Sequence, residues 1–150
     1  MEWKIRKARK EDENRIKELF LEMLHSVYHR QSLRGYQDGY LDKFFENRGD
    51  WICVAEANSA VIAYLAIELH REPETFIYLD DLSVSKQYRN NGIGTVLIKT
   101  AERFAEKMEI PALVLHVEKT NTAARRLYER LGYSIFGEEN TRFQMIKRLG

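Results

Sequence analysis

Apolar and polar residues alternate along the chain with two different periods, and each period indicates one type of secondary structure. Residues 2–8 place Trp3 and Ile5 between charged neighbours, which is the two-residue period of a half-buried strand. Residues 10–27 repeat their apolar positions every three or four residues, as an amphipathic helix does. The same two periods predict further strands at residues 50–57, 60–70, 75–84, 112–117, 133–136 and 141–149, and further helices near residues 41–45, 95–108 and 120–133.

The order of these elements is strand, two helices, three strands, helix, strand, helix and two strands. The turn-forming pair Asn58 and Ser59 separates two apolar runs, which predicts a hairpin and consecutive antiparallel strands. Such an order is typical of the α/β class, with a mixed sheet and helices on both of its faces. No repeat or Pro/Gly/Ser-rich linker interrupts the 150 residues, so we expect one domain over residues 1–150.

Charge and composition narrow the classes of partner. Lys and Arg total 24 and Asp and Glu total 23, so no general basic surface favours a nucleic acid or an anionic membrane. The first residues lack the apolar stretch of a signal peptide, and the longest apolar run is too short to span a bilayer. We therefore expect a soluble cytoplasmic protein. The lone Cys53 lies in an apolar run that should raise its thiol pKa, which disfavours it as a nucleophile.

Gly92 and Gly94 stand between a predicted strand and a predicted helix. Glycines let a backbone approach a ligand closely, and the free N–H groups of a helix start favour an anion such as a phosphate. A phosphate loop of the Walker A type would need Gly-Lys-Ser/Thr, and a dinucleotide fingerprint would need a third glycine where Leu97 stands. Both of these are excluded. The remaining alternative is that the two glycines only shape a turn.

Two motifs carry a resemblance to a known family. The segment LSVSKQYRNNGIG, residues 82–94, resembles the pyrophosphate-binding signature of the GNAT superfamily of acetyl-CoA-dependent N-acetyltransferases. Asn90 departs from the glycine that the family commonly has there, but Asn tolerates a positive φ, so the loop can still form. The segment NTAARRLYERLGY resembles the family's later motif. The matching residues are Arg89, Gly92 and Gly94 in the first motif, and Asn121, Ala124, Leu127, Tyr128, Gly132 and Tyr133 in the second.

The resemblance implies a fold and a cosubstrate. The fold would be a single three-layer GNAT-like domain, with a central, mostly antiparallel sheet that is splayed where acetyl-CoA binds. The loop from Arg89 to Thr95 would hold the pyrophosphate without a metal, and the backbone of residues 82–84 would pair with the pantetheine amides. Asn121 would contact the same arm. The residues expected at acetyl-CoA are Leu82, Ser83, Val84, Arg89, Asn90, Asn91, Gly92, Ile93, Gly94, Thr95 and Asn121.

The resemblance also assigns catalytic roles. Tyr128 would protonate the leaving thiolate, the alternative being an aromatic residue packed on the core. Asp80 and Asp81 are adjacent carboxylates in an apolar strand, and regular alternation predicts that they project to opposite faces. Similarity to acetyltransferases of small amines and polyamines makes Asp80 the candidate general base, through a water, and Asp81 the site for a substrate ammonium. The two roles could be exchanged, or both residues could form an exposed, ion-paired strand end.

Other residues carry weaker signals. His25 and His29 are four apart but lack a third ligand, so no metal is expected. His116 is either a proton relay or a hydrogen-bonded strand residue. By the same resemblance, the tyrosines that would shape the acceptor pocket are Tyr28, Tyr36 and Tyr64.

The predicted function is transfer of acetyl from acetyl-CoA to a primary amine by direct attack in a ternary complex. A small amine or polyamine is favoured as acceptor. A protein α-amine or lysine is the alternative acceptor, and a non-catalytic acyl-CoA sensor is the alternative class. A homodimer is one possible assembly.

Overall fold

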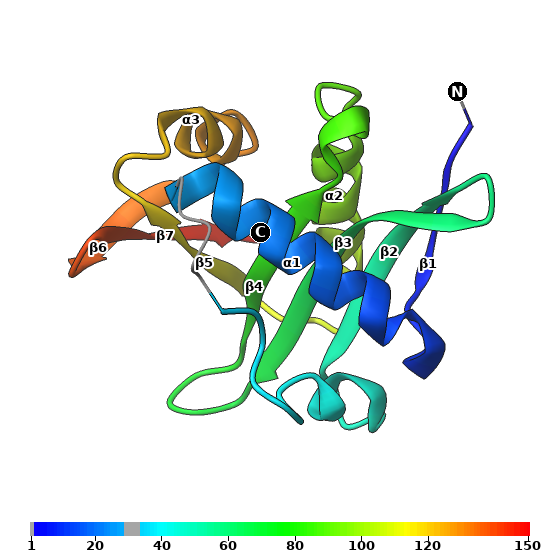
Figure 1. Cartoon of the computed structure of the whole chain (residues 1–150). Helices are drawn as coiled ribbons and strands as arrows, with labels where there is room; N and C mark the ends of the chain where they lie inside the picture. Colours follow the sequence, from blue (N-terminus) through cyan, green and yellow to red (C-terminus); the bar gives the residue numbers. More distant parts are fainter. Residues whose placement is uncertain (1, 29–33) are drawn as a thin grey trace.

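Seven strands form one mixed sheet in the order β1-β2-β3-β4-β5-β7-β6 in the computed structural model, which describes residues 2–28 and 34–150 (Figure 1). Every neighbouring pair is antiparallel except β4 and β5, which are parallel. The predicted order of elements and the mixed α/β class are confirmed. The strands are β1 (Lys4–Lys7), β2 (Trp51–Ala57), β3 (Ala60–His70), β4 (Phe76–Val84), β5 (Ala112–Glu118), β6 (Ser134–Glu139) and β7 (Arg142–Arg148).

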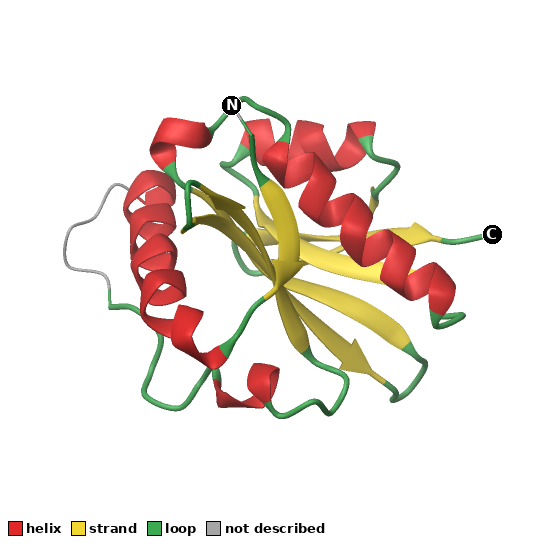
Figure 2. Cartoon of the chain, turned by 90° about the vertical axis from the view of Figure 1, so that its right-hand side faces the viewer, coloured by secondary structure: helices red, strands yellow, loops and turns green. Residues whose placement is uncertain are grey.

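Helices cover both faces of the sheet (Figure 2). The apolar stripe of α1 (Glu13–Tyr28) packs on one face, where Ile16 and Leu19 are fully buried. On the other face, α2 (Ile93–Lys107) buries Leu97 and Ala101, and α3 (Thr122–Arg130) packs beside the same core. The other helical segments are the 3-10 turns η1 (Lys10–Asp12), η2 (Asp42–Phe45) and η3 (Lys86–Tyr88). Among the described residues, none of the helices combines the length and the apolar character needed to cross a membrane.

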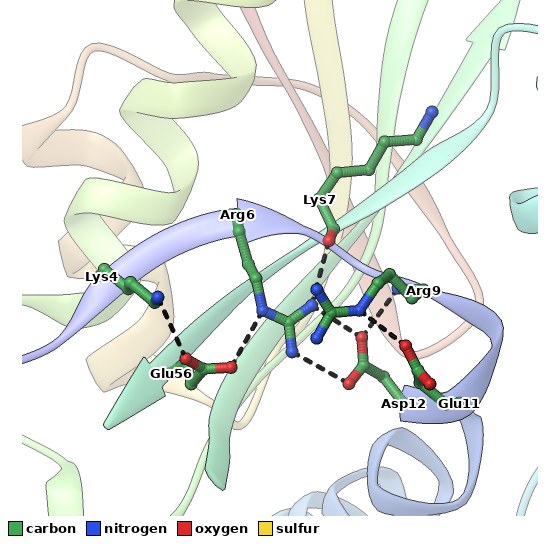
Figure 3. Close-up of polar contacts among 7 residues, drawn as sticks. All are labelled: Lys4, Arg6, Lys7, Arg9, Glu11, Asp12 and Glu56. Atoms are coloured by element: carbon green, nitrogen blue, oxygen red, sulfur yellow. Dashed lines mark hydrogen bonds and ion pairs between the residues drawn. The ribbon is translucent and has the colours of Figure 1, made fainter. Parts of the chain in front are cut away.

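A hydrogen-bonded charge network fixes the first strand against its neighbours (Figure 3). The Arg6 guanidinium donates to both carboxylate oxygens of Asp12, at 2.8 and 3.0 Å, and to Glu56 of β2 at 3.1 Å. Arg6 thereby holds the pKa of Asp12 below its usual value. This network joins β1, β2 and η1, the turn that leads into α1.

An irregularity in β4 determines where the acid pair points. Leu65 of β3 stands opposite Leu82, whereas Ile67 stands opposite Leu79, so two residues of β4 correspond to one of β3. This two-against-one count is that of a β-bulge. Leu79 and Leu82 both pack on the α2 side of the sheet although they are three residues apart. The bulge therefore takes up the extra residue between them.

The prediction that Asp80 and Asp81 project to opposite faces is wrong. Their carboxylates both accept hydrogen bonds from tyrosines that stack on each other on the α1 side of the sheet. The physical reason is the bulge, because the alternation of faces holds only while every residue has one partner across the ladder.

Candidate active site

A pocket of about 1240 Å³ lies where β4 and β5 stop pairing. The two parallel strands pair only as far as Leu79 and Leu115, while β4 continues to Val84 and β5 to Glu118. The start of α2, α3 and the C-terminal half of α1 complete the wall. Of the catalytic and acetyl-CoA-binding residues predicted from the sequence, all but Asn91 line this pocket.

The glycine loop opens one end of the pocket. Asn90 has a φ of 65° and Gly92 a φ of 78°, so the expectation that Asn90 can take the left-handed conformation is confirmed. The side-chain amide of Asn91 donates to the carbonyls of Tyr88 and Arg89, at 3.0 and 3.1 Å, and so holds the loop from within.

The helix start presents free donors at this loop. The first backbone bond of α2 runs from Val96 N–H to Gly92 C=O, so the preceding N–H groups have no acceptor within the helix. A Cβ built on Gly92 would meet no atom within 4 Å, and Gly92 lines the pocket. A backbone with free N–H groups and no side chain on the pocket side fits a pyrophosphate.

The Arg89 side chain bonds both β4 and α1. Its Nε donates to the Val84 carbonyl at 3.0 Å, and one terminal nitrogen lies 3.3 Å from Ser26 Oγ. The guanidinium therefore joins the end of β4 to α1, and the loop is held in place on both sides.

The end of β4 forms the middle of the pocket. Leu82, Ser83 and Val84 pair with β3 along one edge and line the pocket along the other. Ser83 Oγ is buried and donates to the Leu19 carbonyl at 2.8 Å. Across the pocket, Asn121 caps α3 by accepting a bond from Ala124 N–H at 3.2 Å.

The acid pair forms the inner wall of the pocket. Tyr36 donates to Asp81 Oδ2 and Tyr40 donates to Asp80 Oδ2, both at 2.6 Å. The rings of the two tyrosines stack with centroids 5.0 Å apart, and Phe20 of α1 stacks on Tyr36 at 3.8 Å. Among the described residues, the side chains bonded to the two carboxylates are neutral phenols and not Lys or Arg, which disfavours the alternative of an ion-paired strand end.

Burial shifts the titration of both carboxyls. Burial first, and then the neighbouring charge of Asp80, raise the pKa of Asp81 to about 7. The Asp80 pKa is also raised, again mainly by burial. The two neighbouring carboxyls do not ionise independently, and Asp81 exchanges a proton near neutral pH.

Tyr128 lies beside this pair on α3. It is half-buried, lines the pocket, and packs edge-on against Tyr133 at 6.3 Å. Burial and the charge of Asp81 raise its pKa to about 12, above the value near 10 that the sequence suggests. The phenol is therefore fully protonated at neutral pH, as a proton donor must be.

His116 faces the pocket from β5. Its Nδ1 is 2.6 Å from the Tyr78 hydroxyl, and its buried Nε2 has no partner among the described residues. Burial lowers the pKa of His116, so the ring is neutral at neutral pH. Of the two readings of this residue, the hydrogen-bonded strand residue is observed, and the relay stays a prediction.

The remaining candidates are placed as follows. Cys53 is fully buried and burial raises its pKa to about 12, which agrees with its exclusion as a nucleophile. Tyr36 bonds both Tyr64 and Asp81, but neither tyrosine lines the pocket that they were expected to shape. The Tyr28 side chain and His29 lie outside the described residues. Within the part of the chain that the structure describes, no three His, Cys, Asp or Glu side chains are grouped to hold a metal.

Sequence reasoning missed Tyr40, Glu68 and Tyr78. Tyr40 and Tyr78 bond Asp80 and His116, and the buried Glu68 binds Lys43 at 2.6 Å nearby. The only sequence signal was the unusual density of tyrosine and glycine before residue 45, which gives no partner.

The chain is similar to known acetyltransferases. The model of the acetyltransferase (GNAT) family matches residues 14–133. An uncharacterised N-acetyltransferase of Methanocaldococcus jannaschii is 30% identical over 130 residues, which cover 86% of this chain and 76% of that protein. Human N-alpha-acetyltransferase 30 is 37% identical over 67 residues, but these cover 45% of this chain and only 18% of the human protein.

Solved structures show the same fold. The PaiA N-acetyltransferase of Thermoplasma acidophilum, crystallised with coenzyme A, superposes with a TM-score of 0.83 at 20% identity, over 99% of this chain and 100% of that one. A chain in the crystal structure of the NatC complex bound to a Gag peptide and CoA gives a TM-score of 0.77 at 21% identity, over the full length of both chains. With the family model matching most of its length, the protein is an acetyltransferase that belongs to the GNAT family.

Proposed function

We propose that the protein transfers acetyl from acetyl-CoA to a primary amine by direct attack while both are bound, with a small amine or polyamine as the favoured acceptor. The observation that carries the proposal is the half-buried Asp80–Asp81 pair, which lines the same pocket as Tyr128 and the glycine loop. Two carboxylates at the acceptor end attract a cation, and phenol and carboxyl side chains provide an acid and a base.

The residues of the loop and of β4 would hold the cosubstrate. The N–H groups at the start of α2 would bind the pyrophosphate, and the free edge of residues 82–84 could pair with the pantetheine amides. Acetyl-CoA supplies an activated thioester carbonyl when it is bound. The backbone N–H near Val84 is placed on the pocket wall, where it could polarise that carbonyl.

The titration of the acid pair favours an exchange of the roles that the sequence suggested. A general base works best when its pKa is close to the working pH, and Asp81 titrates near 7. We therefore assign Asp81 as the group that takes the proton of the amine. Asp80 then fixes the ammonium before the proton leaves, and Tyr128 gives its proton to the departing thiolate. Burial in the same pocket raises the proton affinity of that thiolate too.

A protein α-amine is the second candidate acceptor. The observation in its favour is the similarity of 67 residues to human N-alpha-acetyltransferase 30. Small amines and peptides with a free N-terminus distinguish the two acceptors in a single assay. A non-catalytic sensor is the third reading, and it would bind acetyl-CoA without using Tyr128 or Asp81.

Acetyl-CoA is expected to stabilise the folded protein, by about 2.7 kcal/mol at one hundred times its Kd, because only the folded loop presents its N–H groups together. Thermal denaturation with increasing acetyl-CoA measures the effect. Gly92→Val should abolish it, because the side chain would fill the space that faces the pocket.

A second substitution separates blocked binding from backbone strain. Gly92→Asn tolerates the observed φ of 78° far better than valine does, so it should keep the parent's stability without ligand. It should nevertheless lose most of the stabilisation by acetyl-CoA. If both variants respond to acetyl-CoA as the parent does, the loop does not hold the pyrophosphate.

A further inference from the structure

Two tyrosine hydroxyls lie in series behind Asp81. The Tyr36 hydroxyl donates to Asp81 Oδ2 at 2.6 Å, and the Tyr64 hydroxyl lies 2.9 Å from the Tyr36 hydroxyl. Tyr64 is fully buried on β3, and neither tyrosine lines the pocket, whereas Asp81 does. The two phenols therefore reach Asp81 from the side away from the substrate.

The number of hydrogens in this chain fixes the direction of each bond. A phenol has one hydrogen to donate and lone pairs to accept. When Asp81 is ionised, the Tyr36 hydrogen goes to the carboxylate, so Tyr64 must donate to the Tyr36 oxygen. When Asp81 is protonated, the whole chain can reverse: Asp81 donates to Tyr36 and Tyr36 donates to Tyr64. Both states then keep the bond between Asp81 and Tyr36 and the bond between Tyr36 and Tyr64.

We propose that Tyr36 and Tyr64 form a reversible hydroxyl chain that holds the Asp81 carboxyl in one place in both of its protonation states. The inference rests on the proposed role of Asp81 as proton acceptor. Tyr36 and Tyr64 are positioning residues, since they act on the substrate only through Asp81. Among the described residues, no group donates to Asp81 Oδ1, so the carboxylate keeps one oxygen for the substrate.

Other charged groups also shift the Asp81 pKa, and the test must separate their effects from that of the hydroxyl chain. Asp80 raises the Asp81 pKa after burial does, Glu68 raises it further, and the Tyr36 bond and Arg142 lower it. The titratable groups that face Asp81 are Tyr36 and Tyr40 from the segment before η2, Tyr64 and Glu68 from β3, Tyr78 and Asp80 from β4, Tyr128 from α3 and Arg142 from β7.

The experiment is a pH titration of the aspartate carboxyl carbons by carbon-13 NMR, with the Asp81 signal assigned by its loss in Asp81→Asn. In the parent, Asp81 should titrate near pH 7. Tyr36→Phe keeps the stacked ring but removes the hydroxyl. Its bond to the ionised carboxylate is charge-assisted and stronger than the reversed bond from the neutral carboxyl, so the Asp81 midpoint should rise by about one pH unit or more. Tyr64→Phe should raise the midpoint by less, because Tyr36 still donates to Asp81.

Tyr40→Phe is the matched control. It also removes one phenol hydroxyl from the tyrosine stack, but the Tyr40 hydroxyl bonds Asp80 and not Asp81. The Asp81 midpoint should therefore stay the same or fall. An unchanged Asp81 midpoint in both Tyr36→Phe and Tyr64→Phe would overturn the proposed hydroxyl chain. An equal rise of the Asp81 midpoint in Tyr40→Phe would overturn it too. Should Tyr36→Phe fail to fold, the Tyr64→Phe midpoint decides.

The NMR result does not depend on catalysis, so it separates this inference from the proposed function. If the Asp81 midpoint moves as expected and the pH at which kcat/KM rises moves with it, the hydroxyl chain and the role of Asp81 as base are both supported. If the midpoint moves but the pH at which kcat/KM rises does not, the hydroxyl chain is supported and Asp81 is not the base.

Discussion

Replacing Tyr128 by phenylalanine is expected to lower the turnover number about 100-fold or more while the affinity for acetyl-CoA stays unchanged. The phenol lies in the pocket beside Asp81, and its raised pKa of about 12 keeps it protonated until the thiolate departs. The substitution removes only the hydroxyl, so the contact with Tyr133 remains. Steady-state kinetics and direct binding of acetyl-CoA, measured on the same preparation, separate chemistry from binding.

Tyr133→Phe is the matched control for this prediction. Its hydroxyl donates to the buried Glu102 at 2.9 Å rather than facing the pocket. Its loss should lower the free energy of unfolding by about 1–3 kcal/mol because a buried charged acceptor loses a donor. Turnover by the folded protein should change little. If Tyr128→Phe turns over like the parent, Tyr128 is a packing residue and its role as acid is wrong.

Replacing Asp81 by asparagine is expected to lower kcat/KM about 100-fold or more at neutral pH, because a general base usually contributes at least that much. In the parent, kcat/KM should rise with pH through about 7, as Asp81 loses its proton and can accept one from the amine. This rise of kcat/KM near pH 7 should be absent in the variant. The loss should shrink at high pH, where free amine is abundant. The pH dependence of kcat/KM with one amine acceptor tests both expectations.

Asp80→Asn is the comparison for the same experiment. It should mainly raise KM for a cationic acceptor and leave more of the turnover, because Asp80 is assigned to hold the ammonium. If Asp80→Asn removes the rise of kcat/KM near pH 7 and Asp81→Asn does not, the two roles are as the sequence first suggested.

The stability of the protein gives a readout of Asp81 that needs no acceptor. The Asp81 pKa is raised in the folded state, so its contribution to stability is present at low pH and is lost as pH rises through about 7. The asparagine variant has no such loss. Its free energy of unfolding, relative to that of the parent, should therefore increase as pH rises from about 4 to 7.

The sequence predicts the elements and the glycine loop well because both depend on local chemistry. The periods of apolar residues locate the strands and helices, and a loop with Asn90 and Gly92 needs only the backbone preferences of those two residues. Two ordered motifs then identify the family without any contact between distant residues.

The surroundings of the acid pair could not be predicted in the same way. The bulge arises from the register of β4 against β3. A two-residue period within one strand does not show how that strand is paired with its neighbour. Tyr36 and Tyr40 lie in a segment without a period, so nothing local indicates that their hydroxyls reach Asp81 and Asp80. The pKa of Asp81 depends on burial and on those contacts, which is why the proposed base differs from the one that the sequence suggests.

Acetyl transfer to an amine is measured with a panel of acceptors. The purified protein is incubated with acetyl-CoA and a panel of monoamines, diamines, polyamines, peptides with a free N-terminus, and blocked peptides that contain lysine. Thiol release and the mass of the product are both recorded. We expect release of one thiol per acetylated amine. The release should be fastest with a small cationic amine and nearly abolished in Tyr128→Phe and Asp81→Asn. Intact acetyl-CoA binding without an acetylated product from any member of the panel would contradict acetyl transfer to an amine and favour an acyl-CoA sensor.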